Sequence, residues 1–213
     1  MSRRGDAGTF QDILLGAYYD LISLILVNII WFLLTLPVVT AIPALGGLYY
    51  ATNRLAHQTP ADWRTFLEGF RAHFWLSWRW GLMNVASFGI LGSSLWFYSQ
   101  VDAAWAEWVH ALMIGLLLWW FMIQVLTYPF LLEQTDRRLP VALRNSLVML
   151  VRRPLFTVLT GVSIGMLILL SVYFMRPAWI FITGSLCAYL ANRAVINTIS
   201  KMQDQSATGR NNQ

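Results

Sequence analysis

Long runs of apolar residues, separated by short basic stretches, dominate this chain. A transmembrane helix needs about 20 predominantly apolar residues to cross roughly 30 Å of hydrocarbon. Five segments reach that length, at residues 17–36, 75–98, 108–132, 155–174 and 178–196. The pattern therefore predicts an all-α fold, a polytopic membrane helix bundle of about five transmembrane helices.

The first apolar stretch is too long for one simple span. It continues from Asp20 to Tyr50 with few polar interruptions, too long for one crossing and too short for two. Pro37 and Pro43 each remove a backbone donor and disfavour helix at the preceding residue. We therefore expect the span to end near Pro37 and a shallower helix to follow from about Pro43 to His57. The alternative is a re-entrant hairpin or a sixth span.

Two segments between the apolar runs have the pattern of amphipathic helices. In residues 59–74, Thr59 suits the N-cap, Pro60 the first helical position, and Asp62 the carboxylate of a capping box. Apolar side chains then recur on one face and charged side chains on the other. A similar helix opens at Pro140. We expect both helices to lie at the cytoplasmic interface or against the spans.

The distribution of Arg and Lys predicts the orientation in the membrane. Twelve of these residues fall in the two long loops, at the start of the second span and in the C-terminal end, and three fall on the other side. Basic loops stay in the cytoplasm, so the two basic loops and the C-terminus are expected there. With five spans the N-terminus lies outside, whereas the hairpin alternative places it inside.

Composition agrees with a membrane protein. The chain is 57% hydrophobic and 12% charged, against about 25% charged residues in soluble domains. The net charge of +5 does not predict nucleic-acid binding, because the basic residues lie in loops between apolar runs. We expect one integral membrane domain over residues 1–202 and a polar, disordered tail over 203–213.

Sequence motifs give no catalytic or metal site. Gly161-x-Ser163-x-Gly165 matches the nucleophile pattern of hydrolases, but that pattern needs a strand-to-helix turn and here lies inside an apolar run. The same glycines predict close helix packing, with Gly89 and Gly92 as a facing surface. The histidines lack metal-ligand spacing. We therefore expect no enzyme, no metal and no cofactor.

Polar residues inside the apolar runs are the better candidates for function. Burying them in lipid is costly, so they tend to face the interior of the bundle, where they form a site or simple hydrogen bonds between helices. Asn192 lies beside Arg193, near the inner end of the fifth span. With the residues of the proline break, the candidates for functional or packing roles are Asn28, Pro37, Thr40, Pro43, Asn84, Gln124 and Arg193.

One region resembles a known family. The residues that carry the resemblance are Asn28-x-x-Trp31, Pro37, Thr40-x-x-Pro43-Ala44, Leu48-Tyr49 and Phe66-x-x-x-Phe70, with a weaker match at Tyr128-Pro129 and Leu143-x-Asn145-Ser146-Leu147. This pattern is similar to that of the YesL-like family of bacterial membrane proteins, from which Gly46-Gly47 depart mildly. The resemblance implies a multi-pass inner-membrane protein of unknown biochemical activity, often associated with carbohydrate uptake and breakdown.

Three functions are compatible with these features. The first is a non-catalytic accessory or partner component that acts with a transporter or cell-envelope protein in the lipid bilayer, or with a second copy of itself. The second is a small oligomeric transporter or channel, because five spans leave little room for a pathway in one chain. The third is an integral membrane enzyme. It has the least support, because the acidic residues and histidines that could be catalytic are scattered along the sequence.

Overall fold

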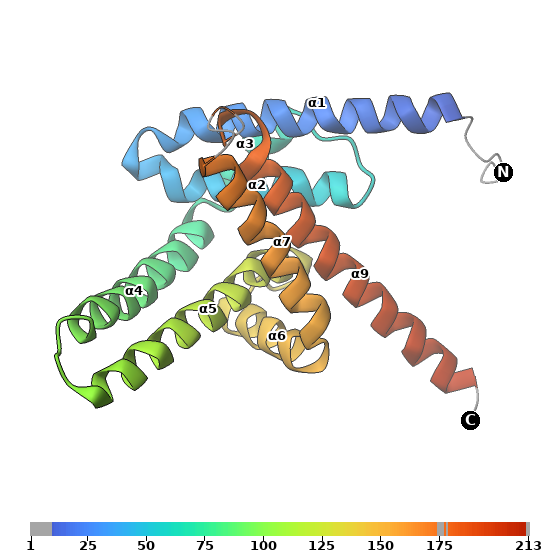
Figure 1. The fold of residues 1–213 in the computed structure, drawn as a ribbon. Coiled ribbons are helices and arrows are strands. Elements are labelled where there is room, and N and C mark those ends of the chain that lie inside the picture. The colour runs from blue at the N-terminus through green and yellow to red at the C-terminus, as the bar shows by residue number, and fades with distance from the viewer. Residues whose placement is uncertain (1–9, 174–176, 178, 212–213) are drawn as a thin grey trace.

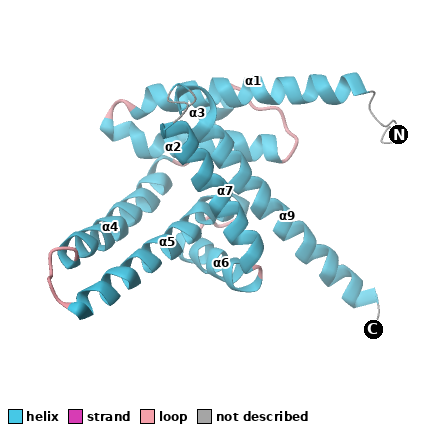
Figure 2. Cartoon of the chain, viewed as in Figure 1, coloured by secondary structure: helices cyan, strands magenta, loops and turns pink. Residues whose placement is uncertain are grey.

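The computed structural model describes residues 10–173, 177 and 179–211, and every regular element in that part is a helix (Figures 1 and 2). The elements are α1 (Phe10–Thr35), α2 (Val38–Ala56), α3 (Trp63–Ala72), α4 (Phe74–Tyr98), α5 (Ala104–Glu133), α6 (Leu139–Arg152), α7 (Pro154–Tyr173), the π-helix η1 (Trp179–Thr183) and α9 (Gly184–Asn211). The predicted all-α helix bundle is confirmed.

Three helices of the described part are long and apolar enough to cross a membrane, over Tyr18–Thr35, Trp105–Glu133 and Pro154–Tyr173. They coincide with the spans expected at 17–36, 108–132 and 155–174. The spans expected at 75–98 and 178–196 lie in α4 and in the η1–α9 segment, which are helical but are not among these three. Residues 174 and 178, at the ends of two expected spans, lie outside the described residues.

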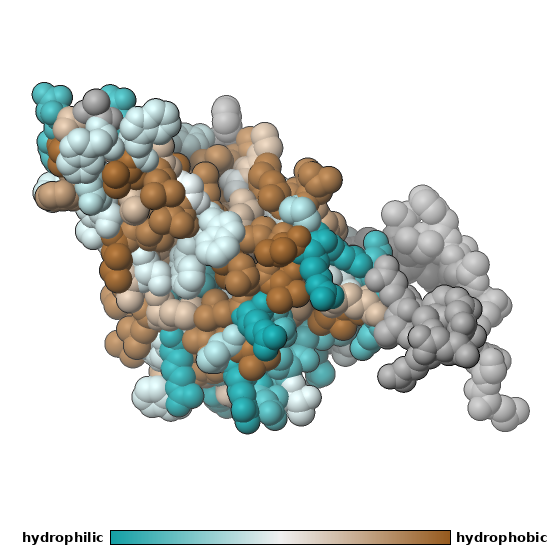
Figure 3. All heavy atoms as spheres, turned by 90° about the horizontal axis from the view of Figure 1, so that it is seen from below, coloured by the Kyte–Doolittle hydropathy of each residue, from teal (hydrophilic) through white to brown (hydrophobic). Residues whose placement is uncertain are grey.

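Large apolar side chains are exposed on α1, α4, α5 and α7, among them Leu33, Ile90, Leu112 and Leu159. Apolar residues also cover much of the face seen in Figure 3, with hydrophilic residues gathered toward its centre and lower edge. A soluble protein rarely exposes so much contiguous apolar surface. The surface is therefore that of a helical membrane protein.

The first helix ends where the sequence predicted a break. α1 stops at Thr35, and Pro37 is the N-cap of α2 in extended conformation. The Thr40 hydroxyl donates to the carbonyl oxygens of Leu34, at 2.6 Å, and of Pro37, at 3.1 Å. The bond to Leu34 satisfies a backbone acceptor that the end of α1 leaves free.

The second helix differs from its prediction. The expected shallow helix from about Pro43 is instead a helix that begins at Val38, contains Pro43 and folds back along α1 (Figure 1). Pro43 removes only one hydrogen bond from this helix, and tertiary packing rather than propensity holds most helices in place. α2 is not among the helices of the described part that are long and apolar enough to cross a membrane, so the shallow helix and the hairpin both stay predictions.

α2 lies at the centre of the structure, with α1, α3, α4 and α9 packed around it. Small residues make this possible. A Cβ atom on Gly46 would meet the Ser77 and Tyr128 side chains, and one on Gly47 would lie 2.9 Å from the backbone oxygen of Phe66. α3, α4 and α5 can approach α2 closely because its surface carries no side chain at these two positions.

The amphipathic helix before α4 begins later than predicted. Its N-cap is Asp62 rather than Thr59, and Thr65 completes the capping box. The backbone amide of Thr65 donates to the Asp62 carboxylate at 2.9 Å and that of Arg64 at 3.0 Å. These bonds, led by that of Thr65, lower the pKa of Asp62. A carboxylate that receives two amides is the better cap, so Pro60 stays outside the helix.

The C-terminal segment also differs from its prediction. α9 continues through Asn211, so the tail expected to be disordered from Gln203 is helical to that residue. The last two residues, 212 and 213, lie outside the described part. Extending an existing helix costs far less than starting one, and no Pro or strong stop signal interrupts this polar sequence.

Replacing Gly47 by alanine should destabilise the protein by about 1–3 kcal/mol, because the added methyl would overpack against a backbone atom that cannot rotate away. Gly92 in α4 is the matched control, since nothing lies within 4 Å of its Cβ position. Gly92→Ala should be neutral or stabilising by up to about 1 kcal/mol, from helix propensity. Thermal unfolding in detergent measures both; equal effects would contradict the packing described for α2.

Candidate functional site

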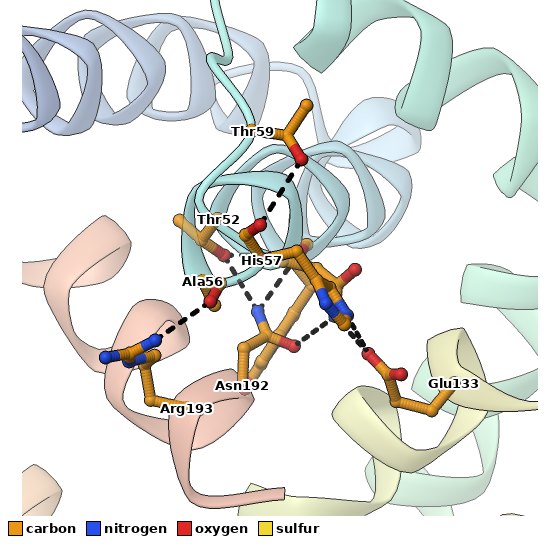
Figure 4. A network of polar contacts seen from close by, with 9 residues as sticks. Thr52, Ala56, His57, Thr59, Glu133, Asn192 and Arg193 are labelled. Atoms are coloured by element: carbon orange, nitrogen blue, oxygen red, sulfur yellow. Dashed lines mark hydrogen bonds and ion pairs between the residues drawn. The ribbon is translucent and has the colours of Figure 1, made fainter. Parts of the chain in front are cut away.

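A network of polar side chains joins α2 and α5 to the middle of α9 (Figure 4). Asn192 of α9 is fully buried, and its Nδ2 donates to the Tyr49 carbonyl at 3.1 Å and to the Thr52 hydroxyl at 3.0 Å. Asn53 Nδ2 donates to Asn192 Oδ1 at 3.4 Å and to Glu133 Oε1 at 2.8 Å. Asn53, a half-buried amide of α2, therefore links three helices.

The ends of α2 and α5 meet in the same network. The Nε2 atom of His57, the C-cap of α2, lies 2.9 Å from Glu133 Oε1 at the end of α5. Arg193 Nη1 donates to the Ala56 carbonyl at 3.0 Å. A cation at the C-terminus of a helix satisfies a free carbonyl and complements the helix dipole, so Arg193 fixes the end of α2 on α9.

Asn28 occupies a second site, at the π-helix. Its Nδ2 donates to the Ile180 carbonyl at 2.7 Å, and the Ser185 amide donates to its Oδ1 at 2.7 Å. The side chain is fully buried. A π-helical turn shifts the backbone bonding pattern, and Asn28 supplies a donor and an acceptor where η1 changes into α9. Asn28 therefore holds the C-terminal helices on α1.

Asn84 and Gln124 form a third site, between α4 and α5. Asn84 Nδ2 lies 3.3 Å from Gln124 Oε1, which also accepts the Trp80 indole N–H at 3.0 Å. One turn before Trp80 on α4, the Ser77 hydroxyl lies 2.7 Å from the Tyr128 hydroxyl of α5. All these side chains are buried, so the two helices are joined by polar contacts within an apolar setting.

The sequence-predicted residues thus fall into separate places. Asn28, the Asn84–Gln124 pair and Arg193 occupy three different sites, and Pro37, Thr40 and Pro43 shape the corner and the start of α2. The structure does not gather them around one cavity.

The two glycines expected to pack differ from each other. A Cβ atom on Gly161 would meet the Met122 side chain of α5, whereas nothing lies within 4 Å of the Cβ position of Gly165. Gly89 and Gly92, the expected facing surface, are also open. Of these four glycines, only Gly161 of α7 marks a close approach to another helix, and that helix is α5.

A groove of about 620 Å³ lies between α5, α6 and α9. Its apolar lining consists of Phe130, Val148, Met149, Ile199 and Met202. We call it the α5–α6–α9 groove. Val148 and Met202 are partly exposed, 39% and 41% respectively, so apolar side chains of this groove face outward.

Polar and charged side chains complete the lining of the groove. Arg152, Arg153, Gln134 and Glu133 lie along it. Glu133 is the residue held by Asn53 and His57, so the α2–α5–α9 network fixes one wall. The two arginines have no acidic partner in the salt bridges of the described residues.

Sequence reasoning missed Asn53, His57 and Glu133 as one cluster. His57 and Glu133 are 76 residues apart, and Asn53 and Glu133 are 80 apart. Only the fold brings them together. A usable signal was present in Glu133 itself, an acidic residue at the end of an apolar run and beside a basic loop. In the part of the chain that is described, no three His, Cys, Asp or Glu side chains are grouped as metal ligands.

Comparison with known proteins gives one similarity. Residues 24–95 match a family described as "Protein of unknown function, DUF624". The match runs from α1 into α4 and contains the residues from Asn28 to Phe70 that carry the resemblance described above; the YesL-like family name stays a prediction. No curated protein and no solved structure matches the chain.

Replacing Asn192 by alanine should destabilise the protein by about 1–3 kcal/mol, because it removes two hydrogen bonds that Asn192 donates to α2 from a fully buried position. Asn197→Ala is the matched control, since Asn197 is exposed on the same helix and should change stability by less than about 0.5 kcal/mol. Thermal unfolding of both variants in detergent gives the comparison. A harmless Asn192→Ala would show that the network does not hold α9 to α2.

Proposed function

We propose that this chain is a non-catalytic subunit of a bacterial inner-membrane assembly, and that its α5–α6–α9 groove binds a helix of the partner protein. The observation that carries the proposal is the groove itself, an outward-facing groove of about 620 Å³ that combines apolar side chains with two arginines. Amphipathic helices commonly bind by laying an apolar face into such a groove.

The chemistry of the lining indicates the kind of partner. Met202, the exposed methionine of the lining, is flexible and polarisable, which suits a surface that packs against another protein. Arg152 and Arg153 favour acidic side chains, while Glu133 is already bonded to His57 and Asn53. The proposed ligand is therefore an amphipathic helix with an apolar face and an acidic edge.

Transport by this chain alone has less support. A substrate pathway would gather polar side chains around one cavity at membrane depth. Here Asn28, Asn84 with Gln124, and Arg193 make hydrogen bonds at three separate sites. A small oligomeric transporter remains the second candidate, and the irregular backbone of η1 beside Asn28 is the feature that favours it.

The distribution of basic residues supports an orientation in the membrane, and the family resemblance supports a biological context. The basic residues predict that the two long loops and the C-terminus face the cytoplasm. The groove is built from residues next to those loops, so we propose that it opens on that side. Because α2 folds back along α1, the N-terminus is proposed to be cytoplasmic as well. Resemblance to the YesL-like family supports a link to carbohydrate uptake or utilisation.

A photo-crosslinking residue placed at Val148 should capture the partner in native membranes, whereas the same residue at Val151 should not. Both valines are exposed on α6, but only Val148 lines the groove. The crosslinked segment, identified by mass spectrometry, should be apolar at helical spacing and carry Asp or Glu. Arg152→Glu should reduce the yield at position 148 about tenfold, as expected for lost charged hydrogen bonds.

Two results would overturn this proposal. One is capture of lipid alone at position 148, and the other is equal capture of the same protein at both positions. An unchanged gel-filtration profile of Arg152→Glu in detergent shows that a lost crosslink is not a lost fold.

A further inference from the structure

A second, smaller pocket lies between α2, α4 and α5, away from the α5–α6–α9 groove. Its volume is about 280 Å³, and its walls are mostly apolar and aromatic, including Ile42, Phe88 and Phe121. Val85, also in the lining, is 63% exposed. Its neighbour Leu82 is 57% exposed, so the pocket opens where α4 presents an apolar surface suited to lipid.

Two buried amides, Asn84 and Gln124, belong to this lining beside the aromatic Tyr49 and Trp80. Their orientations are fixed by neighbours whose hydrogen-bonding roles cannot change. The Trp80 indole nitrogen can only donate, so the atom 3.0 Å from it must be the oxygen of Gln124. The Trp80 backbone carbonyl can only accept, so the atom 2.9 Å from it must be the nitrogen of Asn84.

These orientations leave one acceptor and one donor without a protein partner. Asn84 Oδ1 and Gln124 Nε2 are both buried and make no hydrogen bond within the described residues. The side chains are 9% and 5% exposed. Leaving buried polar atoms unpaired is costly, so a ligand that satisfies both gains more than apolar contact alone.

A hydroxyl group fits this pair, because it is the smallest group that donates one hydrogen bond and accepts another. The walls require the rest of the ligand to be apolar. We propose that the pocket binds the hydroxyl end of a membrane-soluble alcohol, with the hydroxyl donating to Asn84 Oδ1 and accepting from Gln124 Nε2.

The size of the pocket agrees with a partly enclosed ligand. Pockets for small molecules usually span about 300–1,000 Å³, and this one is at the lower limit. It can hold the hydroxyl and the first part of an apolar chain, while the remainder passes Val85 into lipid. The site is independent of the proposed partner helix, since the two pockets share no lining residue.

The probe is hexadecan-1-ol with a photoreactive diazirine near the hydroxyl end, added to the full-length protein in liposomes. Its methyl ether, which accepts a hydrogen bond but cannot donate one, is the matched control ligand. The alcohol should label α4 and α5 around the pocket about fivefold more strongly than the ether, the change expected for one ordinary hydrogen bond. Unlabelled hexadecan-1-ol should compete.

Two variants locate the effect. Asn84→Leu keeps the Trp80–Gln124 bond and should abolish the preference for the alcohol over the ether. Val85→Trp leaves both amides intact and should block labelling at the pocket by either probe. Ser93→Leu is the control on α4, because this exposed hydroxyl bonds only to the Ile90 carbonyl in its own helix, and it should label like wild type.

Equal labelling by alcohol and ether in the wild type would overturn the proposal, as would labelling that Asn84→Leu and Val85→Trp leave unchanged. Gel filtration of each variant in detergent establishes that it is folded, and Val85→Trp changes an exposed side chain, so it tests the location even if Asn84→Leu does not fold.

Discussion

The burial of α2 among four other helices is the constraint on which this structure depends. A central helix must bring its neighbours close and must satisfy its own backbone groups. Gly46 and Gly47 meet the first condition, because atoms of α3, α4 and α5 occupy the space that larger side chains would need. Arg193 of α9 meets the second, through its hydrogen bond to the Ala56 carbonyl at the end of α2, and Asn192 adds a bond to the Tyr49 carbonyl. α9 therefore completes α2 as well as packing against it.

The same constraint organises both candidate binding sites. Glu133, one wall of the α5–α6–α9 groove, is held by Asn53 and His57 at the end of α2. The smaller pocket uses the other end of the same face of α2, where Ile42 and Leu45 line it together with residues of α4 and α5. A change in the position of α2 would thus alter both sites at once.

The sequence predicted the elements of this fold better than their contacts. Apolar length and Pro37 were sufficient to predict the helices and the first break, because these are local properties of the chain. Pro43 misled the prediction, since one missing hydrogen bond is outweighed by tertiary packing around α2. Asn28 and Arg193 could be singled out as costly to bury, yet their partners, 152 and 137 residues away, could not. Asn53 and His57 had no local signal, because their role depends on where α5 ends.

α2 reaches its central position by folding back along α1. The most direct test is therefore to ask on which side of the membrane each end of the α1–α2 pair lies. In a Cys187→Ser background, single cysteines at Gln11, near the start of α1, and at Gln58 can be treated with a membrane-impermeant maleimide in intact cells and in inverted vesicles. A helix that folds back along α1 places both positions on the same side, so both should be protected in cells and react in inverted vesicles. Reaction of the two cysteines from opposite sides of the membrane would contradict the account.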